Sequence, residues 1–144
     1  MITRIYEGHG LRFAYPSDWE LEESDEGEVA TVDVQAPDGL AFALVRSDET
    51  APDPASVADE VLEAMREEYP DLDVSPAMEN IAGHHATGYD VEFFSLDFTN
   101  GATIRSFRTA ERTVLVFGQW SDIGDENLPD LIRAVCRSVE EMED

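Results

Sequence analysis

Apolar and polar side chains alternate over the first part of the chain, and this two-residue period constrains the fold more than any other feature. The pattern runs through residues 11–15, 19–22, 30–34 and 40–44. It places successive side chains on opposite faces, which is typical of strands with one buried face. Pro37-Asp38-Gly39 separates the last two segments and predicts a hairpin turn, because Pro fixes φ and Gly tolerates positive φ. We therefore expect four strands in this region.

The apolar period changes to three or four residues in two later segments, which predicts two helices. The first helix is expected to begin after Asp53, an N-cap followed by Pro54, and to end before Pro70. The second has Asn127 as its expected cap and Pro129 in its first turn. The first apolar stripe comprises Val57, Ala58, Val61, Leu62, Met65 and Tyr69, and the second comprises Leu128, Leu131, Ile132, Val135, Val139 and Met142.

Between the two helical segments the sequence again predicts strands. They cover residues 74–81, 85–98, 102–110 and 113–120. Asn100-Gly101 predicts a tight hairpin turn between the second and third of them. Val114–Phe117 is apolar at four successive positions, so we expect a central strand covered on both faces. Contiguous hairpins argue against a doubly wound parallel sheet, and the sequence predicts an α+β fold, an antiparallel sheet with two helices.

The length of the chain predicts one domain. No repeat, low-complexity tract or linker divides its 144 residues, and single cores usually hold about 100–200 residues. Cys136 is the only cysteine and lies in the second helical stripe, so we interpret it as a buried core residue. Trp120, near a strand end, is likewise interpreted as core rather than as a ligand platform. No segment approaches the ~20 apolar residues of a membrane span, and no apolar leader is visible, which predicts a soluble, cytoplasmic protein unless a leader was removed.

The chain is strongly acidic, with 33 acidic residues against nine basic ones, all arginine, and a formal charge of −24. This charge excludes nucleic acid and anionic membrane surfaces as partners, because both bind through Lys and Arg. The acidic residues are dispersed, and lysine is absent, which is typical of proteins adapted to molar salt. Salt reduces self-repulsion, because the Debye length falls from about 8 Å at physiological ionic strength to about 3 Å at 1 M. An acidic protein from a GC-rich genome and a cation-binding protein are the alternatives, and we expect nonspecific cation binding across the surface.

Two short motifs resemble the PsbP-like superfamily, which groups PsbP subunits of photosystem II, Mog-type Ran-binding proteins and bacterial DcrB-like proteins. Tyr15-Pro16-Ser17-Asp18-Trp19 is similar to the P-x-x-W motif that ends the family's opening strand. Ile81-Ala82-Gly83-His84-His85-Ala86 is similar to its hydrophobic-x-Gly-x-x-Ala step before the long strands. The resemblance covers residues 1–144 and implies a single PsbP-like domain. It also implies a non-catalytic role in assembly, GTPase binding or chaperoning, and it supplies no catalytic residue. The lipoprotein members carry a lipobox cysteine that this sequence lacks.

No residue pattern predicts a catalytic, cofactor-binding or metal site. His84 and His85 would point to opposite faces of a strand, so a metal site would need His9 or a carboxylate such as Asp90. The Asp122–Asn127 loop offers oxygen ligands but lacks the spacing of a calcium loop. No serine lies in G-x-S-x-G, and the phosphate-binding P-loop requires a lysine. We therefore predict no cofactor and no enzyme activity.

Arg105, Phe107 and Thr109 are expected on one face of a strand. In a chain with so few cations, this group could receive an acidic partner or a substrate carboxylate. The simpler interpretation is a cross-strand ion pair between Arg105 and Asp90 or Glu92.

These observations favour a non-enzymatic accessory or protein-binding domain. Its partner is expected to bind the sheet face or edge that the helices leave uncovered. The alternative is a small-ligand carrier or sensor with a pocket between sheet and helix. An exposed apolar patch would favour a protein interface, a closed apolar cavity would favour a ligand, and a buried carboxylate–histidine contact would favour an enzyme.

Overall fold

The described part of the chain confirms the predicted α+β fold. The structure is a computed structural model, and it describes residues 3–95 and 97–142. The strands are β1 (Thr3–Gly8), β2 (Leu11–Pro16), β3 (Glu20–Glu26), β4 (Val29–Gln35), β5 (Ala41–Asp48), β6 (Leu72–Ile81), β7 (His84–Ser95), β8 (Phe98–Arg108), β9 (Thr113–Ser121) and β10 (Glu140–Glu141). The helices are α1 (Pro54–Glu68) and α2 (Leu128–Arg137).

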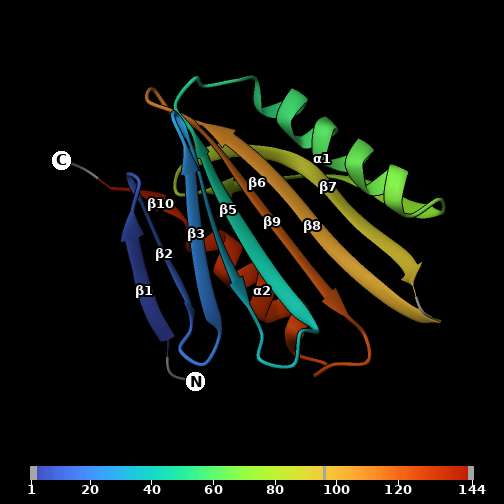
Figure 1. Cartoon of the computed structure of the whole chain (residues 1–144). Coiled ribbons are helices and arrows are strands. Elements are labelled where there is room, and N and C mark those ends of the chain that lie inside the picture. The colour runs from blue at the N-terminus through green and yellow to red at the C-terminus, as the bar shows by residue number, and fades with distance from the viewer. Residues whose placement is uncertain (1–2, 96, 143–144) are drawn as a thin grey trace.

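A seven-stranded antiparallel sheet organises the fold, with the strand order β3-β4-β5-β9-β8-β7-β6. The helices pack against opposite faces, α1 over β7, β8 and β9, and α2 over β5 and β9 (Figure 1). β9 therefore lies mid-sheet with both faces covered, as its apolar run Val114–Phe117 predicts. A smaller sheet of β1, β2 and β10 contacts α2 through β2.

Alternation along the strands divides the apolar side chains between two cores, one on each face of the large sheet. The core under α2 contains Phe13 and Phe107, together with Ile132 from the helix. The core under α1 contains Ile104, together with Leu62 from the helix. This division explains why β8 is buried along most of its length, since its alternate side chains enter different cores.

The two helices begin as predicted, but α2 is shorter than its apolar stripe. Asp53 caps α1, because its Oδ2 accepts a hydrogen bond from the backbone N–H three residues later at 3.1 Å. The stripe predicted α2 to continue to Met142, and this is wrong, because the helix ends at Arg137. Ser138 Oγ accepts a hydrogen bond from Ala14 N at 2.9 Å, which ties the end of α2 to β2. The chain then pairs with β2 as β10.

The turn predicted at Asn100-Gly101 is also wrong, because both residues lie within β8. The turn joins Ser95 to Phe98, which are opposite each other in the register. Asn100 is 9% exposed, and its side-chain amide donates to the carbonyl of Phe98 at 3.0 Å. Long-range pairing of β8 with β9 on its other side thus outweighs the local preference of the Asn-Gly pair.

β1 and β10 have no counterpart among the predicted strands. β1 is exposed or half-buried along its length, so its sequence carries little alternation to detect. β10 has two residues and exists because the register of β2 leaves an edge beside the end of α2. Both strands depend on tertiary contacts rather than on their own sequence.

Candidate functional site

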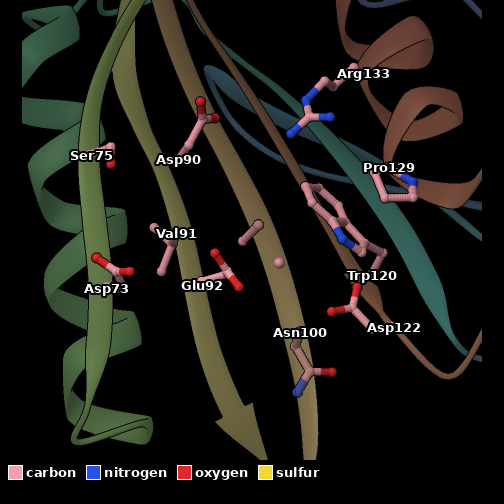
Figure 2. Close-up of a pocket in the computed structure, with 12 residues that line it drawn as sticks. Asp73, Ser75, Asp90, Val91, Glu92, Asn100, Trp120, Asp122, Pro129 and Arg133 are labelled. Carbon is pink, nitrogen blue, oxygen red and sulfur yellow. The ribbon is translucent and has the colours of Figure 1, made fainter. Parts of the chain in front are cut away.

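An acidic cleft lies beside α2, where the helix leaves β6, β7 and β8 uncovered. Its volume is about 290 Å³, and it opens to solvent. Figure 2 shows Asp73, Asp90 and Glu92 on the strands at one side, and Trp120 with Asp122, Arg133 and Pro129 at the other. The carboxylates are Asp73, Asp90, Glu92 and Asp122. We call this hollow the acidic cleft.

Strand register builds the floor of the acidic cleft. Asp73 lies opposite Glu92, and Glu92 lies opposite Gly101. Gly101 in turn lies opposite Trp120, so one row of residues crosses four strands. Like charges directly opposite each other on a sheet face are destabilising, so the Asp73–Glu92 pair opposes folding. Both side chains are exposed to water, and a cation bound between them would relieve this repulsion.

Trp120 forms the opposite wall and lies against Gly101 of β8 and Arg133 of α2. A Cβ on Gly101 would lie 2.3 Å from the indole Cζ2, so only glycine allows this close approach of the ring. The Cζ of Arg133 lies over the ring, 5.3 Å from its centroid. Trp120 is 8% exposed and belongs to the core, as expected, but it also lines the acidic cleft. Its indole nitrogen is not among the buried side-chain atoms without a hydrogen-bond partner, so within residues 3–95 and 97–142 it reaches the solvent of the acidic cleft.

The charges of the acidic cleft are only partly compensated. Asp90 Oδ1 lies 3.0 Å from Arg105 Nη2 in an ion pair. Among the described side chains, Asp73, Glu92 and Asp122 form no ion pair. The guanidinium of Arg133 is the cation at the rim, and it is 3.8 Å from the exposed Asp130. The cleft thus keeps an excess of negative charge facing solvent.

Arg105 anchors the sheet beneath the cleft. Its side chain is 7% exposed, and its Nε donates to Glu79 Oε2 at 2.8 Å. Its Nη1 donates to the carbonyls of Tyr89 and Ile104 at 3.1 and 3.0 Å. Burial alone would raise the pKa of Glu79, but hydrogen bonds from Arg137 and Arg105 outweigh it and lower the pKa below its ordinary value.

The predicted pairing of Arg105 is therefore confirmed for Asp90, but not for Glu92. Glu79 is a partner that the sequence did not predict, because it comes from β6, two strands away from β8. Thr109 does not join Arg105. Its hydroxyl instead donates to Glu141 Oε2 at 2.8 Å, beside Arg112 Nε at 2.9 Å from the same oxygen. This second arginine network ties β10 to the turn between β8 and β9.

None of the three histidines lines the acidic cleft. His84 and His85 are adjacent in β7, and His84 stacks on Phe107, with ring centroids 5.4 Å apart. His9 follows β1, and its Nε2 is 3.6 Å from Glu23. Over the described residues, no group of three His, Cys, Asp or Glu side chains is arranged to hold a metal ion.

The remaining candidate residues have structural roles. In the Asp122–Asn127 loop, Asp125 Oδ1 accepts a hydrogen bond from Asn127 N at 2.8 Å, while the Asn127 side chain makes no capping bond to α2. Cys136 is buried, as predicted, and burial raises the pKa of its thiol to about 12. Neither α1 nor α2 is long and apolar enough to cross a bilayer, as far as the described residues extend.

The antiparallel sheet with one helix on each face defines an α+β fold. No protein-family model and no curated protein sequence matches the chain. Solved structures do match. PsbP (CyanoP) from Synechocystis sp. PCC 6803 superposes with a TM-score of 0.66 and 12% identity, over 97% of this chain and 92% of the other.

Two further structures share the fold. A protein from Bacteroides thetaiotaomicron superposes with a TM-score of 0.62 and 14% identity over 99% of this chain, which spans 48% of that longer protein. LpqN, involved in cell envelope biogenesis of Mycobacterium tuberculosis, gives a TM-score of 0.53 and 11% identity, over 99% of this chain and 91% of the other. At these identities the comparisons establish the fold, and the predicted PsbP-like resemblance is confirmed at that level.

Sequence reasoning did not identify the acidic cleft as a site. One signal was present, because Asp90 and Glu92 occupy alternate positions beside the apolar Val91, and Asp73 precedes the apolar Val74. Alternation places Asp90 and Glu92 on one face. The register that brings Asp73 opposite Glu92, and Trp120 into the same row, depends on pairing between distant segments.

Proposed function

We propose that this protein is a non-enzymatic accessory domain that binds a protein partner, and that the acidic cleft receives a basic, extended segment of that partner. One observation carries the proposal. Among the described residues, Asp73 and Glu92 lie opposite each other without an ion-pair partner, in the same row as the solvent-facing indole N–H of Trp120. The PsbP-like fold supports an accessory role by analogy, since it is shared with PsbP and LpqN.

The unpaired groups define the chemistry of the occupant. The exposed carboxylates favour a positively charged group, and the N–H of Trp120 can donate to a neutral acceptor such as a carbonyl. A peptide containing Lys or Arg offers both groups at short spacing. A nucleic acid or an anionic lipid would place phosphates against Asp73 and Glu92, which is unfavourable. A basic peptide segment is therefore the occupant that satisfies every unpaired group in the cleft.

Binding to the sheet face is favoured over strand addition at an edge. The β3 edge carries Glu20, Glu22 and Glu26, which also discourage pairing with a second copy of this chain. The β6 edge contains Pro76, which lacks the N–H that an added strand would need. Both edges are thus protected, whereas the acidic cleft is open.

Fluorescence anisotropy with a labelled peptide containing Lys-Ser-Lys-Ser-Ser tests the proposal. The double variant Asp73→Asn/Glu92→Gln should weaken binding about tenfold or more at 0.1 M salt, since each ion pair contributes about 1 kcal/mol in water. The double variant Glu22→Gln/Glu26→Gln removes the same charge from the β3 edge and should change affinity less than about twofold. If both double variants lost the same affinity, the peptide would be bound by the overall negative charge of the protein and not by the acidic cleft, which would contradict the proposal.

The alternative function, a carrier of a small ligand, makes a different prediction in the same experiment. The acidic cleft does lie between the sheet and α2, as that alternative expects, but it is open and rich in carboxylates rather than closed and apolar. If arginine amide binds as tightly as the labelled peptide, the peptide backbone contributes nothing to the affinity. The carrier function would then be favoured over the protein-binding one.

We also propose that the surface is adapted to high salt. Residues 20, 22, 23, 25 and 26 of β3 are exposed acids, and Glu22 lies opposite Asp33 in the next strand. Screening should relieve this repulsion, so the melting temperature should rise between 0.1 and 2 M KCl.

KCl is preferred to a sulfate salt, because sulfate strengthens apolar burial in any protein. The triple variant Glu20→Gln/Glu22→Gln/Glu26→Gln should melt higher at 0.1 M and gain less from salt, and a flat or falling melting temperature of the unmodified protein would contradict the proposal.

A further inference from the structure

A second hollow adjoins the acidic cleft at the end of β7. Its volume is about 400 Å³, and its apolar lining residues are Pro70, Leu72, Phe93 and Phe94, although Phe93 is only 2% exposed and offers almost no surface. Asp73 and Glu92 line both hollows, so the two lie next to each other. We call this second hollow the apolar end of the cleft.

Phe94 gives the apolar end its exposed surface. Its side chain is 74% exposed, although burying a phenylalanine fully is worth about 1.5–3 kcal/mol. Its neighbour Phe93 is buried in the core under α1, where it lies 4.3 Å from the ring of Tyr69. Alternation along β7 therefore places Phe94 on the opposite face, the face of Glu92 and the acidic cleft.

The exposed area is too small to hold a second copy of this chain. Phe94 is 74% exposed, and a whole phenylalanine offers about 150–250 Å². A stable interface buries about 800 Å² on each partner. Two molecules of this acidic chain would also bring Asp71, Asp73 and Glu92 of each copy together. The apolar end suits one side chain of a partner segment rather than a dimer.

We infer that the apolar end of the cleft binds an apolar side chain of the same segment whose basic residue occupies the acidic cleft. This inference rests on the proposed function. Glu92 and Phe94 are two residues apart on β7, which is about 7 Å along a strand. A segment extended along β7 presents every second side chain to the sheet at the same spacing. The domain therefore recognises a basic and an apolar residue separated by one residue.

Charge complementarity identifies the remaining chemistry of the segment. Asp71, Asp73 and Glu92 line the apolar end, and Asp97 lies in the adjoining turn. A purely apolar segment would leave these carboxylates without partners. A segment that combines the two residue types satisfies both the exposed aromatic ring and the surrounding charges.

Three labelled peptides test whether the basic and the apolar residue must be separated by one residue. Lys-Ser-Lys-Ser-Leu should bind about five- to tenfold tighter than Lys-Ser-Lys-Ser-Ser, because leucine buries part of its side chain against Phe94. Lys-Ser-Lys-Leu-Ser has the same composition as the first peptide but directs the leucine away from the sheet, and it should gain less than about twofold. The same series in reverse order covers a segment that runs in the opposite direction.

Two variants of the protein locate the effect. Phe94→Ser should abolish the gain from leucine while leaving the binding of Lys-Ser-Lys-Ser-Ser unchanged. Phe98→Ser is the matched control, because Phe98 lies opposite Ser95 and therefore points to the other face; it should keep the full gain. Because Phe94 and Phe98 are exposed, neither variant should lower the melting temperature.

The outcomes separate this inference from the proposed function. If Lys-Ser-Lys-Ser-Ser binds and leucine adds nothing, or if the gain survives Phe94→Ser or is equal at both spacings, the inference is wrong and the proposed function stands. If the gain depends on Phe94 but Asp73→Asn/Glu92→Gln has no effect on any peptide, the apolar end binds its residue and the proposed role of the acidic cleft is wrong. If no peptide binds, both are wrong.

Discussion

Replacement of Arg105 by alanine is expected to lower the free energy of unfolding by about 3–5 kcal/mol, the range for removing one partner of a buried ion pair. The side chain is 7% exposed and donates to two carboxylates and two backbone carbonyls. Its loss leaves the carbonyls of Tyr89 and Ile104 without these bonds and opens space between the sheet and α2. The result should fall toward the lower end of the range, because Asp90 is 43% exposed and Glu79 keeps its bond to Arg137.

Urea unfolding at pH 7 measures this change, and Arg137→Ala is its matched control. Arg137 bonds the same Glu79 but is 58% exposed, so its removal should cost less than about 1 kcal/mol. If Arg105→Ala and Arg137→Ala lowered the free energy of unfolding equally, the burial of Arg105 would not strengthen its contribution to stability, and the prediction would be wrong.

The pH dependence of the Arg105→Ala difference gives a second check. The folded-state pKa of Glu79 is lowered from 4.5, so its ionised form contributes stability above pH 4.5 that is lost as the pH falls through the lowered value. Arg105 supplies part of that lowering. The difference between the unmodified protein and Arg105→Ala should therefore be largest above pH 4.5 and narrow below it.

Gly118→Val is expected to cost about 3 kcal/mol, because overpacking a filled core costs about 1–3 kcal/mol and occasionally more. A Cβ at Gly118 would lie 2.1 Å from Cγ2 of Ile132, whose side chain is fully buried. The methyl group cannot move aside without moving α2 away from the sheet. Because Arg133 is the next residue of the helix, its contact with Trp120 should be lost as well, which tryptophan fluorescence would detect.

A double-mutant cycle tests whether the contact between Gly118 and Ile132 is the cause. Ile132→Ala alone should cost about 2–5 kcal/mol through the cavity that it creates. Valine adds three carbons and alanine removes three, so the double variant conserves volume, and its cost should be smaller than the sum by about 0.5–3 kcal/mol. If the double variant lost as much free energy of unfolding as the two single variants together, then Gly118 and Ile132 would not be in close contact.

The two failed local predictions show where sequence reasoning stops. The Asn100-Gly101 pair has a strong turn preference, yet β8 extends through it because it pairs with β7 and β9 at once. Gly101 is needed there for a different reason, the close approach of Trp120. Val139, the next apolar residue of the stripe, is buried as predicted, but it lies between α2 and β10 and not in the helix. In both places a tertiary contact outweighs a local preference of about 1 kcal/mol.

The sequence by itself determined the properties that depend on near neighbours in the chain. These are the strand alternation, the Asp53 cap, the turn at Pro37-Asp38-Gly39, the burial of Cys136 and the acidic surface. Each follows from a period or a preference that acts within a few residues.

Only the tertiary structure decided which distant residues meet. The order of the strands brings Asp73, Glu92 and Trp120 into one row and sets Glu79 beside Arg105. A two-residue period says which face a side chain occupies but not which strand lies next to it, nor in which register. Pairing is selected by the burial of both faces of the sheet at once, a property of the whole chain, and the acidic cleft is the part of one face that α2 leaves uncovered.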